Sequence, residues 1–242
     1  RNEAAEGIPL VICSKGIEIS SGLMLSQVVE EVLPDATCAV MTGPTFAREI
    51  AQGLPSAMTL ATADKDVAHD LSENLACRTL RPYLSDDVLG VQIGGAVKNV
   101  LAIACGVITG RKMGESARAA LMTRGVAEMG RLASALGAKK ETLTGMCGFG
   151  DLVLTCSSMQ SRNYSLGVML GEGRGVDEVL GERKSVTEGV HTAKALMTLA
   201  QKNAVEMPIS ESVYKCLVEG VDMDEMINEM MNRPFAHQYN KG

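Results

Sequence analysis

The first ninety residues of the chain alternate between short apolar runs and amphipathic segments. Short runs rich in β-branched residues predict buried strands, and apolar residues at helical spacing between them predict helices. The predicted strands cover residues 9–13, 38–41, 57–61, 79–83 and 88–92, and the predicted helices cover residues 23–32, 46–52 and 67–76. Continuous apolar strands that alternate with helices are typical of sheets covered on both faces, so this half predicts an α/β layer with a mainly parallel sheet.

The hydrophobic pattern changes after about Gly94, and no strand pattern returns. Long apolar stretches at residues 96–108 and 116–136 predict two long helices. Shorter helices are predicted at residues 141–147, 164–170, 188–202, 210–218 and 223–231. The predicted fold class is therefore α/β plus all-α, with an α/β domain over residues 1–93 and an all-helical domain over residues 94–242.

Composition narrows the classes of function. The chain has 242 residues with 23 Lys and Arg against 29 Asp and Glu, a net charge of −6, and it lacks Trp. A chain without a basic excess and with few aromatic rings is a poor match for nucleic acid, so no such partner is expected. Apolar runs stay short of the roughly 20 residues that span a bilayer, and the first residues lack the apolar core of a signal peptide. We therefore expect a cytoplasmic protein without a membrane span.

Cysteine and histidine usage argues against metal and disulfide chemistry. The seven Cys are odd in number, widely spaced and contain no C-x-x-C, and the three His lie at positions 69, 191 and 237. This spacing excludes a zinc ribbon and disfavours a disulfide framework or a Ser-His-Asp triad. We predict no metal site, and we interpret most of the cysteines as small core residues in a reducing compartment.

One predicted helix carries a lysine in an apolar setting. Lys98 and Asn99 are flanked by Ala, Val, Leu and Ile for a full turn on either side. A lone lysine in a helix usually extends its amine to the surface, and that is the alternative interpretation. If Lys98 instead faces a cleft, partial desolvation lowers its pKa and makes it a candidate general acid or base.

Further candidate residues lie where predicted strands end and helices begin. Lys15 follows one strand and the segment 42–47 follows the next, and in open parallel sheets ligands bind at this edge. Asp151 follows a Gly-rich stretch, and Arg162 stands beside Asn163 at a helix start. The alternatives are a plain strand-to-helix turn, a helix N-cap at Asp151 and a solvated Arg162. Taken together, these residues predict a local positive pocket for a small anionic substrate.

Seven sequence blocks also carry a family resemblance. They read SKGIE at 14–18, GPTFARE at 43–49, GAVKN at 95–99, TRGVAEM at 123–129, GFGDLVLT at 148–155, SRN at 161–163 and VTEG at 186–189. In this order, and over nearly the whole chain, they resemble the bacterial-type NAD(P)-dependent glycerol-3-phosphate dehydrogenases. The resemblance implies the C-terminal portion of a Rossmann-type parallel sheet, followed by a helical substrate and dimerisation domain.

The resemblance further implies an oxidoreductase that interconverts dihydroxyacetone phosphate and sn-glycerol 3-phosphate by hydride transfer with NAD(P)H, feeding glycerophospholipid synthesis. It implies that Lys98 is the catalytic acid/base. The implied substrate contacts are Lys15, Gly43, Thr45, Lys98, Asn99, Asp151, Thr155, Ser161, Arg162 and Asn163. The implied cofactor contacts are Lys15, Ala47, Arg162, Val186 and Glu188. The partner is then a small phosphorylated substrate, and a homodimer is the candidate assembly.

One part of the family pattern is not found in this sequence. The family begins with a strand and a Gly-x-Gly-x-x-Gly-type turn that holds the pyrophosphate, and Lys15 matches a position late in that domain. We therefore expect on the order of a hundred residues of the pattern, including the residue that distinguishes NAD from NADP, ahead of Arg1. The sheet is then expected to expose an edge.

Two alternatives to this dehydrogenase stay open from the sequence. In the first, this chain by itself is an inactive module that binds a phosphate ligand or a partner subunit. In the second, it is a related two-domain reductase that acts on another hydroxy acid.

Overall fold

The structure, a computed structural model of the chain, describes residues 8–183 and 187–233. Within them a four-stranded sheet has the order β1 (Leu10–Ile12), β2 (Cys38–Thr42), β3 (Ser56–Ala61) and β4 (Leu80–Ser85). The pairs β1–β2 and β3–β4 are parallel, whereas β2 and β3 are antiparallel. The expectation of a mainly parallel sheet is confirmed, but the sheet is mixed. The short helix α2 (Ala47–Ala51) returns the chain at one end of the sheet instead of crossing its face.

Different elements cover the two faces of the sheet. Side chains alternate between the faces along a strand, so neighbouring residues of β3 join different clusters. Leu60 packs with Leu71 of α3 (Lys65–Leu75), and Ala61 packs with Val91. Both faces of the central strands β2 and β3 are therefore largely buried, which explains why their sequences are mostly apolar instead of alternating.

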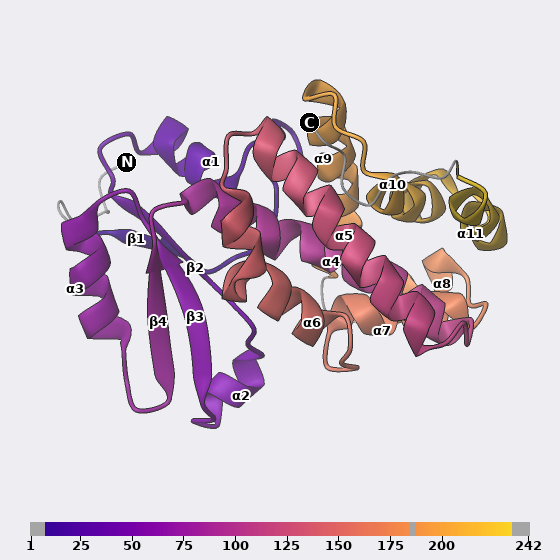
Figure 1. The fold of residues 1–242 in the computed structure, drawn as a ribbon, viewed down its shortest axis with the longest axis horizontal. Coiled ribbons are helices and arrows are strands. Elements are labelled where there is room, and N and C mark those ends of the chain that lie inside the picture. Colours follow the sequence, from indigo (N-terminus) through magenta and orange to yellow (C-terminus); the bar gives the residue numbers. More distant parts are fainter. Residues whose placement is uncertain (1–7, 184–186, 234–242) are drawn as a thin grey trace.

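The rest of the described chain is helical (Figure 1). The helices are α1 (Leu25–Val32) beside the sheet, then α4 (Val88–Gly110), α5 (Glu115–Ala135), α6 (Asp151–Thr155), α7 (Arg162–Gly171), α8 (Val176–Glu182), α9 (Glu188–Lys202), α10 (Pro208–Tyr214) and α11 (Met223–Met231). This confirms the expected fold class of α/β plus all-α. The exact boundary at residues 93 and 94 stays a prediction, because α4 runs through it without a break.

The predicted strand at residues 88–92 is wrong, because these residues form the first turn and a half of α4. Asp87 precedes the helix and its side chain accepts the backbone N–H of Gly90, which caps the helix. A short apolar run cannot be assigned to a strand or a buried helix by periodicity alone. Here the run continues into the apolar residues after Gly94, and the longer helix prevails.

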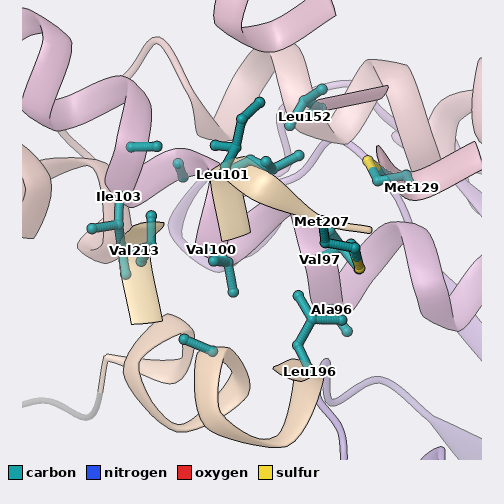
Figure 2. Packing of buried hydrophobic residues seen from close by; sticks show 14 of the residues in the cluster. Ala96, Val97, Val100, Leu101, Ile103, Met129, Leu152, Leu196, Met207 and Val213 are labelled. Carbon is teal, nitrogen blue, oxygen red and sulfur yellow. The ribbon is translucent and has the colours of Figure 1, made fainter. Parts of the chain in front are cut away.

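Helix α4 is the centre of the hydrophobic core. Its residues are buried from Gly90 to Ile108, and side chains such as Val97 and Leu101 belong to one buried cluster with Met129 of α5 and Leu196 of α9 (Figure 2). By length and composition alone α4 passes as a candidate membrane span, although Gln92, Lys98 and Asn99 interrupt its apolar run. However, 94% of its most apolar window is buried inside the protein, as in the core helix of a globular domain.

Helices α4 and α7 approach each other through glycines. A Cβ built on Gly167 would lie 2.0 Å from the carbonyl oxygen of Ile103, and one on Gly106 would lie 2.2 Å from that of Tyr164. No other residue fits at these contacts without a backbone shift. The close contact fixes α7 along α4, and with it the position of Arg162 at the start of α7.

Two of the predicted shorter helices have a different form. Residues 141–147 are divided between a 3₁₀ helix (Lys140–Thr144) and a π-helical turn (Met146–Gly150). Residues 210–218 are divided between α10 and a second π-helical turn (Lys215–Glu219). The hydrophobic spacing located both segments but did not distinguish hydrogen bonds to i−3, i−4 and i−5, which differ little in periodicity.

Candidate active site

Four side chains from distant parts of the sequence form one hydrogen-bonded network. Lys15 Nζ donates to Asp151 Oδ2 at 2.7 Å, and Lys98 Nζ donates to Asp151 Oδ1. Lys98 Nζ also donates to Thr155 Oγ1 at 2.9 Å, and Thr155 Oγ1 donates to Asp151 Oδ1 at 3.3 Å. The structure thus brings together predicted site residues from the end of β1, from α4 and from α6.

Burial decides between the alternatives left open for two of these residues. Lys98 is 4% exposed, so it does not extend its amine into bulk water. Asp151 is 0% exposed and both of its oxygens accept from lysines. Gly150, not Asp151, is the residue that caps α6. The side chain of Lys15 is 20% exposed, so Lys15 marks the side on which the network is open to solvent.

Two glycines in α4 allow the network to assemble. A Cβ on Gly95 would lie 3.4 Å from Lys15 Cγ and 3.3 Å from Thr42 Oγ1, so Gly95 makes room for the stem of Lys15. A Cβ on Gly94 would lie 2.5 Å from the carbonyl oxygen of Cys147. The π-helical turn that leads into Asp151 therefore lies directly on α4, one helical turn before Lys98.

The pKa of Lys98 is lowered from its ordinary value to about 7, chiefly by burial and also by the charge of the neighbouring Lys15. Asp151 acts in the opposite direction and keeps the pKa from falling lower still. An amine with a pKa near neutrality exchanges protons readily at physiological pH. Two lysines share one aspartate here, so the network carries excess positive charge when both amines are protonated, which suits an anionic ligand.

A second group of predicted residues lies where α7 and α9 begin. The Ser161 side chain caps α7 by accepting the N–H of Tyr164 at 3.2 Å. Asn163 Oδ1 accepts the N–H of Gly189 at 2.9 Å, and Arg162 forms an ion pair with Glu188. The structure therefore brings these residues together at the starts of α7 and α9, and among the described residues no hydrogen bond joins them to the lysine network.

Asn99 lies between the two groups. It is 5% exposed, next to Lys98 on α4, and a Cβ on Gly189 would lie 2.8 Å from the Asn99 carbonyl oxygen. The start of α9 therefore packs on the turn of α4 that carries the lysine. The two groups of predicted residues flank this turn.

The predicted contacts Gly43, Thr45 and Ala47 follow β2. The Thr45 N–H bonds to the Gly43 carbonyl at 2.9 Å, and Ala47 is the first residue of α2. Thr45 does not cap α2, because Phe46 holds that position and no side chain caps this helix. Pro44 Cγ lies 3.6 Å from where a Cβ on Gly150 would stand, so this loop borders the segment leading into Asp151.

Thr42 begins the predicted segment 42–47 but is not among the implied contacts, and the structure places it in the site. It is 2% exposed, and its hydroxyl is buried without a hydrogen-bond partner among the described residues. It lines a small recess with Lys15, Gly95 and Gln92. Its position at the carboxyl end of β2 was the available signal, because ligands in such sheets bind at that edge.

Val186, an implied cofactor contact, lies outside the described residues. Among the described residues no three His, Cys, Asp or Glu side chains group in a way that could hold a metal ion.

A sheet with a lysine–aspartate network beyond the ends of β1 and β2, covered by a helical domain, has the design of the two-domain, nicotinamide-dependent oxidoreductases. Comparison with known proteins makes this specific. Residues 2–68 match the model for the N-terminus of NAD-dependent glycerol-3-phosphate dehydrogenase, and residues 87–228 match the model for its C-terminus. The chain belongs to the NAD-dependent glycerol-3-phosphate dehydrogenase family.

Individual relatives agree with this assignment. The chain is 52% identical over 234 residues to glycerol-3-phosphate dehydrogenase (NAD(P)+) of Parvibaculum lavamentivorans, covering 97% of this chain and 70% of the relative. It is 57% identical over 226 residues to that of Rhodospirillum rubrum, covering 93% and 65%. The crystal structure of glycerol-3-phosphate dehydrogenase from Coxiella burnetii superposes with a TM-score of 0.90 at 42% identity, covering 93% and 69%. The chain thus spans about two thirds of the length of these relatives.

Proposed function

We propose that this chain provides the substrate-binding and proton-transfer part of a site that interconverts dihydroxyacetone phosphate and sn-glycerol 3-phosphate with NAD(P)H. The observation that carries the proposal is the buried amine of Lys98, held between Asp151 and Thr155. This amine has a pKa of about 7, so it can both give and take a proton near neutral pH.

Lys98 is the proposed acid in reduction and base in oxidation. Its protonated amine has three N–H groups, and Asp151 and Thr155 accept two of them. The third remains for the carbonyl oxygen of the substrate, where it stabilises the developing alkoxide and then transfers its proton. Asp151 orients the amine throughout, and Lys15 adds positive charge from the open side.

Arg162 and Asn163 are the proposed phosphate contacts. Arg162 is 48% exposed in its side chain and pairs with Glu188. A guanidinium donates in two directions from its planar fork, so a phosphate can bind while the pair persists or can displace Glu188. Asn163 uses its carbonyl oxygen to hold Gly189, which leaves its amide N–H groups as donors for an anion.

The residues present fit the edge of a dinucleotide site. The recess with the unpartnered hydroxyl of Thr42 lies beside Lys15 at the carboxyl end of the strands. The family resemblance implies Ala47, Arg162 and Glu188 as further cofactor contacts. When bound, the nicotinamide would supply or accept the hydride. Thr42, Lys15 and Gly95 would shape the wall against which it rests.

The test is turnover of dihydroxyacetone phosphate by the protein, which is measured as the decrease in absorbance of the reduced nicotinamide. Replacing Lys98 with Ala should lower kcat about 10²–10⁴-fold, the range for losing a general acid. Lys194→Ala is the matched control, because Lys194 is exposed on α9 and should turn over like wild type. Wild-type turnover by Lys98→Ala would contradict the proton-transfer role.

The two alternatives have their own tests. An unphosphorylated analogue, dihydroxyacetone, should be a poor substrate if Arg162 and Asn163 bind phosphate, and equal turnover would favour a reductase of another hydroxy acid. Calorimetry with NAD(H) on the 242-residue chain separates an active site from an inactive binding module. A supply of glycerol phosphate for lipid synthesis, a cytoplasmic location and a homodimer accompany the proposed function as further predictions.

A further inference from the structure

The Lys98–Asp151 pair joins segments that are 53 residues apart in the sequence. Lys98 is on α4, and Asp151 follows the 3₁₀ helix and the π-helical turn, which together we call the 139–150 segment. A proton donor must be positioned to well within 1 Å, because such a displacement changes rates by about 10²-fold. The segment therefore needs an attachment to α4.

We propose that Asp87 is a positioning residue that fixes the 139–150 segment on α4 and thereby sets the geometry of Lys98 and Asp151. The proposal rests on the proposed function, since it assigns a residue that acts through that site. Among the described residues, Asp87 itself forms no hydrogen bond with Lys15, Lys98 or Asp151.

The two oxygens of the Asp87 carboxylate have different partners. Oδ1 accepts the N–H of Gly90 at 2.9 Å, which is the ordinary bond of a helix cap. Oδ2 accepts the backbone N–H of Lys139 at 2.9 Å and the hydroxyl of Thr142 at 2.6 Å. A cap needs only the first of these oxygens. The second is used to bind the distant segment.

The bonds of Asp87 are shielded from water. Asp87 is 7% exposed, and Leu143, beside Thr142, is buried in the main core. A hydrogen bond to a buried carboxylate is roughly twice as strong as a neutral one. Outside this shielded contact, Lys139 Nζ also pairs with Asp86 at 2.7 Å, so two successive carboxylates hold the start of the segment.

The far end of the 139–150 segment is held by close packing. The Cys147 carbonyl lies against Gly94, and the Cys147 side chain packs with Val91 and with Val40 of the sheet. The π-helical turn is closed by the Gly150 N–H bonding to the Gly145 carbonyl at 3.1 Å. With Asp87 at one end and Gly94 at the other, the segment cannot slide along α4, and Asp151 follows immediately.

We call the attachment of Asp87 Oδ2 to the Lys139 N–H and the Thr142 hydroxyl the clamp. The variant that isolates the clamp is Asp87→Asn. Asparagine caps helices as well as aspartate does, so the bond to Gly90 is retained. Its amide NH₂ then faces the N–H of Lys139, so that bond is lost, and the hydroxyl of Thr142 can no longer donate to this position but only accept from it. Thr142→Val tests the same contact from the other side, by removing one donor from a side chain of the same shape.

Matched controls separate the clamp from the cap and from the segment. Asp64→Asn changes a cap with the same chemistry on α3, whose side chain bonds only to Asp66 and Val67. Thr144→Val removes a hydroxyl in the same segment that bonds only to Glu141. Neither change touches the contact between the segment and α4.

The first readout is the titration of Lys98, which is monitored by carbon-13 NMR of labelled lysine. The Lys98 signal is assigned by its loss in Lys98→Arg. Asp151 raises the pKa of Lys98, so loosening Asp151 should lower that pKa, by about one unit. The second readout is hydrogen exchange, which should become faster for amides 139–150. In turnover, kcat should fall about 10- to 100-fold, with a smaller change in KM.

The outcomes separate the clamp from the proposed function. NMR and hydrogen exchange need no substrate or cofactor, so they test the clamp even if wild type turns over no dihydroxyacetone phosphate, a result that would count only against the proposed function. An unchanged Lys98 titration and unchanged exchange in Asp87→Asn would overturn the clamp, as would equal effects in Asp64→Asn. If Asp87→Asn does not fold, Thr142→Val decides by the same readouts.

Discussion

At the scale of single residues, Lys98 is under two opposing influences. Burial destabilises its charged form, and the Asp151 carboxylate stabilises it. If burial acted alone, the amine would be neutral and unable to donate at physiological pH. If Asp151 dominated, the proton would be held too tightly to transfer. The balance gives a pKa of about 7, which suits a group that works in both directions of a reversible reaction.

A pH–rate profile should reveal this pKa. Reduction needs protonated Lys98, so kcat for reduction should fall as the pH rises through about 7. Oxidation needs the neutral amine, so kcat in that direction should rise over the same interval. Steady-state rates in both directions measure this, and profiles that move in the same direction would contradict the assignment of both steps to Lys98.

The identities of the site residues could be predicted from the sequence, but the hydrogen bonds between them could not. Lys98, Asp151 and Lys15 were each singled out from local sequence and from the family resemblance. Their shared network was not, because local sequence does not specify contacts across 136 residues, the separation of Lys15 and Asp151. The same is true of Arg162 and Glu188, which were assigned to ligands and which bond to each other.

At the scale of elements, a buried carboxylate joins α5 to α10. Glu128 is 1% exposed and accepts from the N–H groups of Ile209 and Ser210 and from the Ser210 hydroxyl. Burial raises its pKa to about 7, although these bonds lower it. The folded state therefore binds this proton more tightly than the unfolded state, in which the pKa is 4.5.

This shift predicts how stability changes with pH. The contribution of protonated Glu128 is complete below 4.5 and is lost as the pH rises to about 7, which amounts to about 3 kcal/mol at 1.36 kcal/mol per unit. The free energy of unfolding of Glu128→Gln, measured in urea, should therefore rise relative to that of wild type as the pH increases between those two values. Glu30→Gln, on the exposed side of α1, should show no such gain. A constant difference between Glu128→Gln and wild type would contradict the raised pKa.

The contact between α4 and α7 gives a second prediction at this scale. Gly167→Ala places a methyl group 2.0 Å from the Ile103 carbonyl oxygen, and the overpacking should cost about 1–3 kcal/mol. At about 2–4 °C per kcal/mol for a chain of this size, Tm should fall by several degrees. Gly130→Ala has open space around its Cβ and should raise Tm slightly, because alanine favours helix. A scanning calorimeter distinguishes these opposite shifts, and equal Tm values would show that α7 can move away from α4.

At the scale of the whole molecule, an apolar groove opens between α4, α5, α10 and α11. Its lining includes Ile108, Leu121, Val213, Met226 and Met230, and the neighbouring Met231 is 76% exposed. Exposed apolar surface of this kind is typical of interfaces. The flexible methionine side chains adapt readily to a partner's surface.

The groove is where the expected homodimer can be tested. Met231→Glu places a charge on its rim and should shift a dimer toward monomer in sedimentation velocity. Val32→Glu adds the same charge at an exposed site on α1 and should leave the assembly unchanged. A dimer that persists in Met231→Glu would place the interface elsewhere, and a monomeric wild type would exclude the homodimer itself.

The sequence by itself determined most of the elements and their order, since apolar spacing reports which residues must leave water, although it predicted a strand at residues 88–92 and no helix at α8. It also supplied the chemical identities of the site and the family. Tertiary structure decided three further things: that residues 88–92 continue a helix, that one of the sheet pairings is antiparallel, and that Asp151 binds two lysines while Asp87 holds its segment in place. Each depends on contacts between residues far apart in the chain, and such contacts are set by packing and by burial of charge rather than by local spacing.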